Sequence, residues 1–376
     1  MKALKNPKNF ESPLWRDKTL AASAFEKMAR LTVGAVSRTG KTVSLMEVCG
    51  SHTMAIAASG MRRLFPKGLK MLSGPGCPVC VTAQGDIDLV LELAARPGVI
   101  IATFGDMLKV RGSNGLDLRS MREKGADVSV VYSPMDALSL ARENPGRQVV
   151  FVGVGFETTA PVIAGAVLRA RAEKNKNFSV IPLFKLVPPA LELLLKAPNH
   201  NISGFMLPGH VSAIIGLEPY RFVVEKYAAP CVVTGFEPLD ILAGINMLLQ
   251  QIVSGVPALE SEYGRAVRSD GNPRALEIMR EVFSVTEARW RSIGAIKKSG
   301  LGFSRAFSGF DAVKRFKLSY RDAPEPKGCI CGGILLGKAL PADCGLFGKA
   351  CSPSHAVGPC MVSSEGACAA WFKYGG

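Results

Sequence analysis

The sequence lacks any long run of apolar residues, and this excludes an integral membrane protein built from spanning helices. No stretch approaches the roughly 20 apolar residues that a transmembrane helix needs. Residues 1–20 are polar and include Arg16, Asp17 and Lys18, so they lack the apolar centre of a secretion signal. We therefore expect a cytoplasmic protein with no membrane partner.

A nucleic-acid recognition module is also absent, although the net charge is +15. Much of the excess lies in residues 265–321, which hold 13 Lys or Arg against 5 Asp or Glu, a net of +8. The span is either a solvated surface or a docking site for an acidic protein. We do not expect nucleic acid as a partner.

The composition is that of a globular protein with buried cores. Hydrophobic residues make up 48% of the 376 residues and charged residues 20%, which argues against disorder. The length suggests two or three domains. Ten cysteines in a cytoplasmic chain are expected to be metal ligands or redox thiols rather than structural disulfides.

Apolar segments rich in Val and Ile alternate with amphipathic segments over about two hundred residues, a pattern that predicts an α/β fold with parallel sheets. Strands are expected at 43–48, 99–104, 128–132, 149–154, 202–207 and 231–234. Helices are expected at 11–38, 84–93, 135–143, 160–174, 189–196, 239–254 and 273–296.

The triplet Gly-Phe-Glu occurs twice after a Val-rich strand, at 155–157 and 235–237, which suggests two related halves. We predict two Rossmann-like parallel-sheet halves plus a cysteine-rich iron–sulfur domain. The expected bounds are 40–143 for the first half, 144–256 for the second, and 1–39 with 257–376 for the helical and iron–sulfur domain.

Two thiols at C-x-x-C spacing lie in the stretch 74–80, whose two glycines and two prolines disfavour regular structure. The stretch follows the apolar segment 69–72, an expected strand, and precedes the expected helix at 84–93. Cys77 and Cys80 therefore form a candidate redox or metal-binding dithiol. Cys49 and His52 lie where another strand ends and a helix begins, the edge at which α/β sheets bind ligands.

The last fifty residues hold six cysteines among many Pro and Gly, and they show too little periodicity to form a core of their own. Zinc favours paired C-x-x-C knuckles, which this tail lacks, whereas wider spacings are typical of a cubane iron–sulfur cluster. Spacing alone does not select four ligands among the six. The cysteines are Cys329, Cys331, Cys344, Cys351, Cys360 and Cys368.

The sequence resembles the HypD family of hydrogenase maturation proteins. The resemblance covers nearly the whole chain, with mild departures at Ser51 and Trp371, where Thr and Tyr are expected. It is carried by residues 47–53, 74–80, 155–161, 208–212, 234–238 and 361–368.

The resemblance implies a scaffold that helps to build the Fe(CN)₂CO group of [NiFe]-hydrogenases. It implies a [4Fe–4S] cluster on a C-x14-C-x6-C-x16-C pattern, which falls here on Cys329, Cys344, Cys351 and Cys368. Cys331 and Cys360 remain as small buried residues or neighbours of the ligands.

The implied partners are a HypC-like chaperone, a HypE-like donor that carries cyanide as a thiocyanate, and, through the chaperone, the hydrogenase large subunit. Cys49 would hold the iron and ionise easily at its helix N-terminus. Cys77 and Cys80 would supply two electrons, which the cluster would replace one at a time.

Three further residues are candidates for the site. His52 and His210, both in loops that follow strands, could ligate iron or donate protons. Glu157 could orient one of these histidines, or it could cap the helix that starts near Ala160.

Two alternatives remain open. A cluster-dependent disulfide reductase would need the cluster and the dithiol but not Cys49 or His52. An iron-binding scaffold would need Cys49, with Cys77 and Cys80 only structural.

Overall fold

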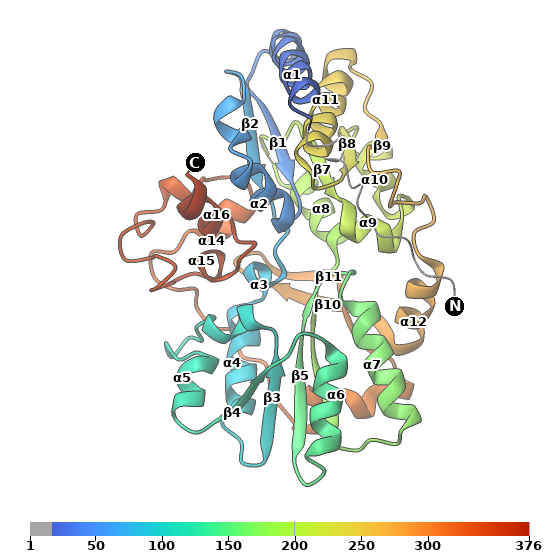
Figure 1. Cartoon of the computed structure of the whole chain (residues 1–376), viewed down its shortest axis with the longest axis vertical. Helices are drawn as coiled ribbons and strands as arrows, with labels where there is room; N and C mark the ends of the chain where they lie inside the picture. Colours follow the sequence, from blue (N-terminus) through green and yellow to red (C-terminus); the bar gives the residue numbers. More distant parts are fainter. Residues whose placement is uncertain (1–16, 199, 376) are drawn as a thin grey trace, which may run out of the picture.

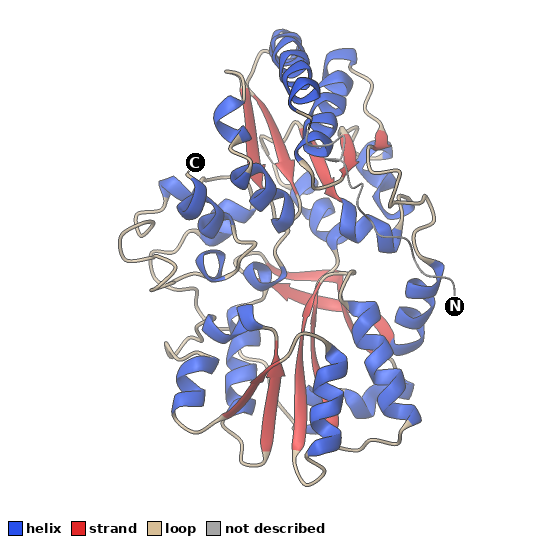
Figure 2. Cartoon of the chain, viewed as in Figure 1, coloured by secondary structure: helices blue, strands red, loops and turns tan. Residues whose placement is uncertain are grey.

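The chain folds around two parallel β-sheets that lie one above the other in Figure 1, with an antiparallel hairpin between them. The computed structural model describes residues 17–198 and 200–375. Helices surround both sheets (Figure 2). Within these ranges no helix is both long and apolar enough to cross a membrane.

The first sheet has the strand order β2-β1-β7-β8-β9, and every pair in it is parallel. Its central strands are apolar and buried on both faces, as expected where helices cover both sides of a parallel sheet. The strands are β1 (Val43–Glu47), β2 (Leu69–Ser73), β7 (Gly204–Pro208), β8 (Cys231–Thr234) and β9 (Leu259–Ser261).

The second sheet has the order β4-β3-β5-β6 and is also entirely parallel. The hairpin of β10 and β11 is antiparallel. The strands are β3 (Val99–Thr103), β4 (Asp127–Val130), β5 (Gln148–Gly155), β6 (Phe178–Phe184), β10 (Phe283–Trp290) and β11 (Gly294–Phe303).

The helices begin and end at recognisable sequence signals. Ser133 caps α6 in a capping box with Pro134 in its first turn, and Gly255 ends α11 in the left-handed conformation. The longer helices are α1 (Lys18–Thr39), α2 (Gly50–Ala58), α4 (Gln84–Ala94), α6 (Pro134–Glu143), α7 (Ala160–Ala172), α8 (Val187–Lys196), α11 (Pro238–Ser254), α12 (Pro273–Val282) and α16 (Ala367–Tyr374). The shorter helices are α3 (Pro78–Val81), α5 (Leu118–Glu123), α9 (Gly209–Ile215), α10 (Arg221–Glu225), α13 (Ala312–Arg315), α14 (Cys331–Leu335) and α15 (Pro359–Val362).

The α/β class and the two parallel sheets are confirmed, but the sheets do not follow the predicted boundary at 143/144. The first sheet takes strands from before residue 74 and after residue 203, whereas the second takes the strands between. The reason is that β1 pairs with both β2 and the distant β7. The predicted boundary therefore lies inside the second sheet, just before β5.

The predicted helix at 273–296 is wrong in its second part. The helix α12 ends at Val282, and β10 begins at the next residue. Phe283 and Trp290 are seven residues apart, so they fit a helical stripe as well as the buried ends of a strand. The helix predicted at 11–38 is α1 from Lys18 onward; residues 11–16 lie outside the described part.

The largest of three apolar cores connects the two sheets with the cysteine-rich tail. Tail residues such as Ile334 and Met361 belong to this core together with Phe205 of the first sheet and Val152 of the second. The tail therefore does not fold as a separate body. It lies against α2 and α3 on the left side of Figure 1.

Candidate functional site

Two cysteine-containing loops lie side by side at one edge of the first sheet. Cys49 follows β1 and Cys77 follows β2, and these strands are parallel neighbours, with Glu47 opposite Ser73. The Gly50 amide donates a hydrogen bond to the Gly76 carbonyl over 3.0 Å. The two loops therefore follow neighbouring parallel strands and meet at one edge of the sheet.

The close approach of the loops depends on Gly76. A Cβ at this position would overlap the backbone of Cys49. The glycine therefore serves contact between the loops, because any side chain would push Cys49 away from the Cys77 loop.

The C-x-x-C pair is a disulfide in this structure. Cys77 and Cys80 are bonded, with their Cα atoms 5.2 Å apart, and both side chains are buried. The Cys77 sulfur also accepts a hydrogen bond from the Cys80 amide at the start of α3. On the other side, the Cys80 sulfur lies 3.9 Å from the Pro359 carbonyl of the tail.

Cys49 precedes the first turn of α2, as predicted, but it does not ionise easily. Burial raises the pKa of its thiol to about 12, and the nearby Glu365 carboxylate adds to the increase. The backbone amides of Ser51 and His52 lower the pKa by less than burial raises it. In the iron-free chain the Cys49 thiol is therefore protonated at neutral pH.

Glu47 is a site residue that the sequence analysis missed. It lies at the end of β1, it is buried, and burial raises the pKa of its carboxyl to about 8. The Thr53 hydroxyl donates to Oε1 over 2.5 Å, and the Cys49 amide is 3.5 Å from Oε2. The available signal was a carboxylate within an otherwise apolar strand, two residues before a cysteine.

Glu365 is a second missed residue, and it comes from the tail. The Ser51 hydroxyl donates a hydrogen bond to Glu365 Oε1 over 2.6 Å. A Cβ on Gly50 would meet the Glu365 backbone, so the tail packs directly on the start of α2. The sequence held no local signal for this contact between residues that are 314 positions apart.

His52 is buried and is bonded to the loop after β8. Its Nε2 lies 2.9 Å from the Gly235 carbonyl and 3.2 Å from the Thr234 carbonyl. Two acceptors at one nitrogen require that Nε2 carries the proton and donates. Burial lowers the pKa of His52 to about 4, so the ring is neutral. Its Nδ1 is buried without a hydrogen-bond partner.

Both candidate histidines stack on the ring of Phe236. The His52 and Phe236 centroids are 4.6 Å apart, and the His210 and Phe236 centroids are 3.8 Å apart. His210 is exposed, and partial desolvation lowers its pKa while the charge of Glu365 opposes this. The structure thus connects both histidines with the edge of the first sheet that carries Cys49.

Glu157 contacts neither histidine by hydrogen bond among the described residues. Its Oε1 accepts a bond from the Val187 amide over 2.9 Å, in the first turn of α8, and Oε2 is buried without a partner. Burial raises the pKa of this carboxyl to about 7. The capped helix is therefore α8 and not the helix that begins at Ala160.

The six tail cysteines line a single small cavity, together with a few apolar side chains such as Ile334 and Phe347. They come from segments that are up to 39 residues apart in sequence. No carboxylate or histidine lines the cavity. Thiols alone are the donor set that iron–sulfur clusters use, so the residues present fit such a group. As they stand, no three Cys, His, Asp or Glu side chains in the described ranges converge on a single ion.

The tail thiols differ in their proton affinity. Burial raises the pKa of Cys329 to about 12 and raises that of Cys368 further. Cys360 donates a hydrogen bond to Cys331, which lowers the pKa of Cys331 and raises that of Cys360. The two cysteines that the four-cysteine pattern leaves over are therefore paired with each other.

Asp106 ties the tail to the second sheet. It follows β3, and its Oδ2 accepts hydrogen bonds from the Ser363 and Ser364 hydroxyls, each over 3.1 Å. The tail is thus held from both sheets, by Asp106 on one side and by Gly50 and Ser51 on the other.

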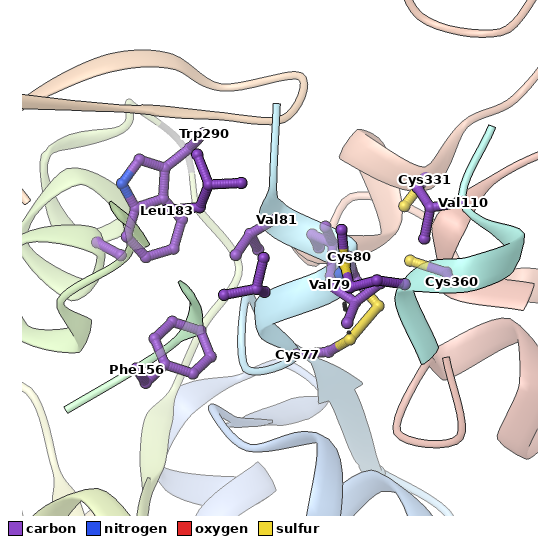
Figure 3. Packing of buried hydrophobic residues seen from close by; sticks show 14 of the residues in the cluster. Cys77, Val79, Cys80, Val81, Val110, Phe156, Leu183, Trp290, Cys331 and Cys360 are labelled. Atoms are coloured by element: carbon purple, nitrogen blue, oxygen red, sulfur yellow. Dashed lines mark hydrogen bonds between the residues drawn. A yellow bond between two sulfur atoms is a disulfide. The ribbon is translucent and has the colours of Figure 1, made fainter. Parts of the chain in front are cut away.

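The disulfide and the tail cysteines share one apolar core. Cys77, Cys80, Cys331 and Cys360 all belong to it, and Figure 3 shows them in one packed region. The disulfide and the cysteine-lined cavity therefore belong to one buried apolar region.

Only part of the basic span at residues 265–321 is exposed, so only part of it could dock an acidic partner. Arg291 is buried, Arg265 pairs with Asp240, and Arg315 donates to Gly309 O and Lys176 O. The remaining cations include exposed Lys297. Whether they dock a partner stays a prediction.

Comparison with known proteins identifies the family. A family model named HypD and described as "Hydrogenase formation hypA family" matches residues 23–375. A protein of Rhodobacter capsulatus named hydrogenase maturation factor HypD is 44% identical over 369 residues, which cover 96% of this chain and 97% of the relative. Its namesake in Escherichia coli K12 is 44% identical over 335 residues, covering 89% and 90%.

An archaeal relative is similarly close. A putative hydrogenase expression/formation protein of Methanocaldococcus jannaschii is 40% identical over 363 residues, which cover 95% of this chain and 98% of that protein. The matches extend over both sheets and the tail. The chain therefore belongs to the HypD family of hydrogenase maturation factors.

Proposed function

We propose that this chain is a scaffold on which the Fe(CN)₂CO group of a [NiFe]-hydrogenase is assembled, and that its Cys77–Cys80 pair supplies electrons. Family membership supports the process. The observation that carries the redox role is the disulfide packed between the Cys49 loop and the cysteine-lined cavity. A HypC-like chaperone, a HypE-like cyanide donor and, through the chaperone, the hydrogenase large subunit are the proposed partners.

Cys49 is the proposed ligand for the iron that is being decorated. Iron is here the cargo, and a thiolate is a suitable soft ligand for it. Because burial keeps the Cys49 thiol protonated, iron must displace that proton when it binds. The neighbouring helix N-terminus then stabilises the thiolate through the Ser51 and His52 amides.

The tail is the proposed holder of a [4Fe–4S] cluster, with Cys329, Cys344, Cys351 and Cys368 as its ligands. When bound, such a cluster supplies electrons one at a time. The cavity is bounded by thiols and apolar side chains. The chain's own residues enclose the tail cysteines, which are buried apart from half-buried Cys329, and so exclude water.

The proposed release of cyanide consumes two electrons, which the Cys77–Cys80 pair can supply. Release of cyanide from a thiocyanate needs two electrons and gives cyanide and a thiolate on the donor protein. Cys77 and Cys80, as one thiol and one thiolate, supply two electrons when they form the disulfide, and they release one proton. The disulfide in this structure is then the spent state, which two one-electron steps return to the dithiol.

The alternative of a disulfide reductase has weaker support. Such an enzyme needs a thiolate that can attack an incoming disulfide. Such an enzyme would have no need for Cys49, whereas the Cys77 loop packs directly on the Cys49 loop.

Purification of the chain with its chaperone partner tests the proposal. We expect iron to co-purify, and infrared spectra to show bands of cyanide and carbonyl bound to that iron. Iron without such bands would favour the simple iron scaffold. A complex without any iron beyond that of the tail would contradict the proposal.

A further inference from the structure

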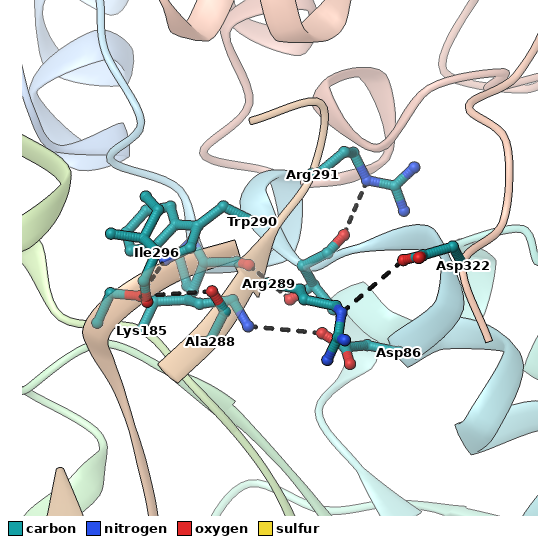
Figure 4. Close-up of polar contacts among 11 residues, drawn as sticks. Asp86, Lys185, Ala288, Arg289, Trp290, Arg291, Ile296 and Asp322 are labelled. Carbon is teal, nitrogen blue, oxygen red and sulfur yellow. Dashed lines mark hydrogen bonds and ion pairs between the residues drawn. The ribbon is translucent and has the colours of Figure 1, made fainter. Parts of the chain in front are cut away.

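Arg291 lies at the turn of the β10–β11 hairpin, where it is 1% exposed. Its backbone amide donates to the Val81 carbonyl, and its Nε donates to the Thr82 carbonyl, each over 2.8 Å. Its Nη1 donates to Gln84 Oε1 over 2.7 Å. Figure 4 shows the side chain extending from the hairpin. The guanidinium thus binds the segment that immediately follows Cys80.

The same residue also contacts the segment that leads into the cysteine-rich tail. Nη1 forms an ion pair with Glu325 Oε2 over 2.7 Å, and the next amide, that of Ser292, donates to Glu325 Oε1. A Cβ on Gly332 would meet the Ser292 side chain, so the turn packs against the start of α14. Arg291 therefore lies where the disulfide loop, the hairpin and the tail meet.

The Glu325 carboxylate only partly neutralises the positive charge of Arg291. The Glu325 side chain is 32% exposed, so water screens its charge, whereas the guanidinium is buried. Nη2 is buried and has no hydrogen-bond partner in the described part of the chain. Its bond to Thr82 places the cation on the order of 10 Å from Cys80, because consecutive Cα atoms are about 3.8 Å apart.

We propose that Arg291 is a positioning residue that raises the reduction potential of the Cys77–Cys80 disulfide. The inference rests on the redox role given to this pair in the proposed function. Reduction breaks the sulfur–sulfur bond and takes up two electrons and one proton, which leaves Cys80 as the thiol and Cys77, whose sulfur accepts the Cys80 amide, as the thiolate. A buried cation stabilises that negative charge. The two electrons would come from an external one-electron reductant of the ferredoxin class, by way of the tail cysteines that would hold the proposed cluster.

Paired substitutions on the two members of the ion pair test this inference. The full chain is equilibrated with dithiothreitol of known redox ratio, and alkylation followed by mass spectrometry gives the reduced fraction of Cys77 and Cys80. For Arg291→Gln we expect the equilibrium constant for reduction to fall about tenfold, which corresponds to about 30 mV. For Glu325→Gln we expect a shift in the opposite direction, because the cation loses its counter-charge.

The opposite signs separate an electrostatic role from a structural one. Both substitutions break the same ion pair, so a merely structural effect would move the two constants in the same direction. Arg291→Lys keeps the charge and is expected to stay within about threefold of the wild type. Arg289→Gln changes an exposed cation of the same hairpin and serves as the matched control.

Equal potentials for the wild type and Arg291→Gln would overturn the inference, as would shifts of the same sign for the Gln variants of Arg291 and Glu325. If Arg291→Gln does not fold, the Glu325→Gln and Arg291→Lys variants still decide the question. The measurement reads the disulfide directly. A negative result would therefore refute only the role of Arg291. Iron binding at Cys49, the basis of the proposed function, is tested separately by the infrared experiment.

Discussion

The Ser51 hydroxyl donates a hydrogen bond to the Glu365 carboxylate over 2.6 Å, and this bond joins the cysteine-rich tail to the helix that begins beside Cys49. The tail thus contributes to the surroundings of the proposed iron site as well as enclosing its own cavity. Its carboxylate also adds to the raised pKa of the Cys49 thiol. The position of the tail and the pKa of the Cys49 thiol are therefore physically connected.

Gly76 should tolerate no side chain. In Gly76→Ala the new methyl group would overlap the Cys49 backbone, and we expect a loss of about 1–3 kcal/mol in unfolding free energy, as for other overpacked sites. Urea denaturation followed by circular dichroism measures it. Gly146→Ala is the matched control, because a Cβ there meets no atom within 4 Å. Equal stability of the two variants would show that the loops are not in the contact described.

The two histidines should differ in their contribution to stability. His52→Ala removes a buried donor from two carbonyls and leaves a cavity, so we expect a cost of about 2–4 kcal/mol. His210→Ala, at an exposed ring, should cost less than about 1 kcal/mol. Chemical denaturation of both variants gives the comparison. A larger loss for His210→Ala would refute the structural role of His52.

Glu157 should make the fold less stable as pH rises. Burial raises the pKa of its carboxyl from 4.5 to about 7, so the folded chain binds a proton that the unfolded chain releases between these values. Stability therefore falls as pH rises from about 4.5 to 7, by up to about 3 kcal/mol. Glu157→Gln should lack this component and exceed the wild type at pH 8, but not at pH 4.5.

The matched control for this pH experiment is Glu143→Gln, which changes an exposed carboxylate at the end of α6. Its pH profile should parallel that of the wild type. Identical profiles for all three proteins between pH 4.5 and 8 would mean that Glu157 is not buried as described.

The cluster proposed for the tail should hold the tail closed. In Cys344→Ala we expect loss of the cluster's visible absorbance and faster protease cleavage within residues 325–358, because metal binding contributes directly to folding of such a segment. Cys231→Ala, which removes a buried thiol outside the cavity, is the control. A cluster-free variant whose tail remains fully protected would count against a structural role for the cluster.

Most strands and helices of the α/β region were predictable because each has a strong local pattern, although β6 (Phe178–Phe184) was not among the expected strands. The strand expected at 231–234 is β8 (Cys231–Thr234), and the helix expected at 239–254 is α11 (Pro238–Ser254). Which strands become neighbours was not predictable. The pairing of Leu45 with Gly204 joins residues 159 positions apart, and no local periodicity encodes it.

The candidate site shows the same difference between features that local sequence predicts and features that only tertiary packing creates. Cys49, Cys77 and Cys80 stand out in the sequence by residue type and by their place after a strand. Glu47 and Glu365 act through tertiary contacts, and the raised pKa of Cys49 follows from burial that the sequence does not reveal. Sequence therefore indicates the reactive groups, whereas packing determines their protonation.

The division of labour among the three N-terminal cysteines is the central claim, and infrared spectroscopy of the complex with the chaperone tests it most directly. Cys49→Ala should abolish the bands of cyanide-ligated iron while its Cys77–Cys80 pair remains titratable. Cys80→Ala should retain some iron in the complex but fail to mature hydrogenase in cells. The account is contradicted if the Cys49→Ala complex still carries cyanide-ligated iron, or if a Cys80→Ala strain produces active hydrogenase at the normal level.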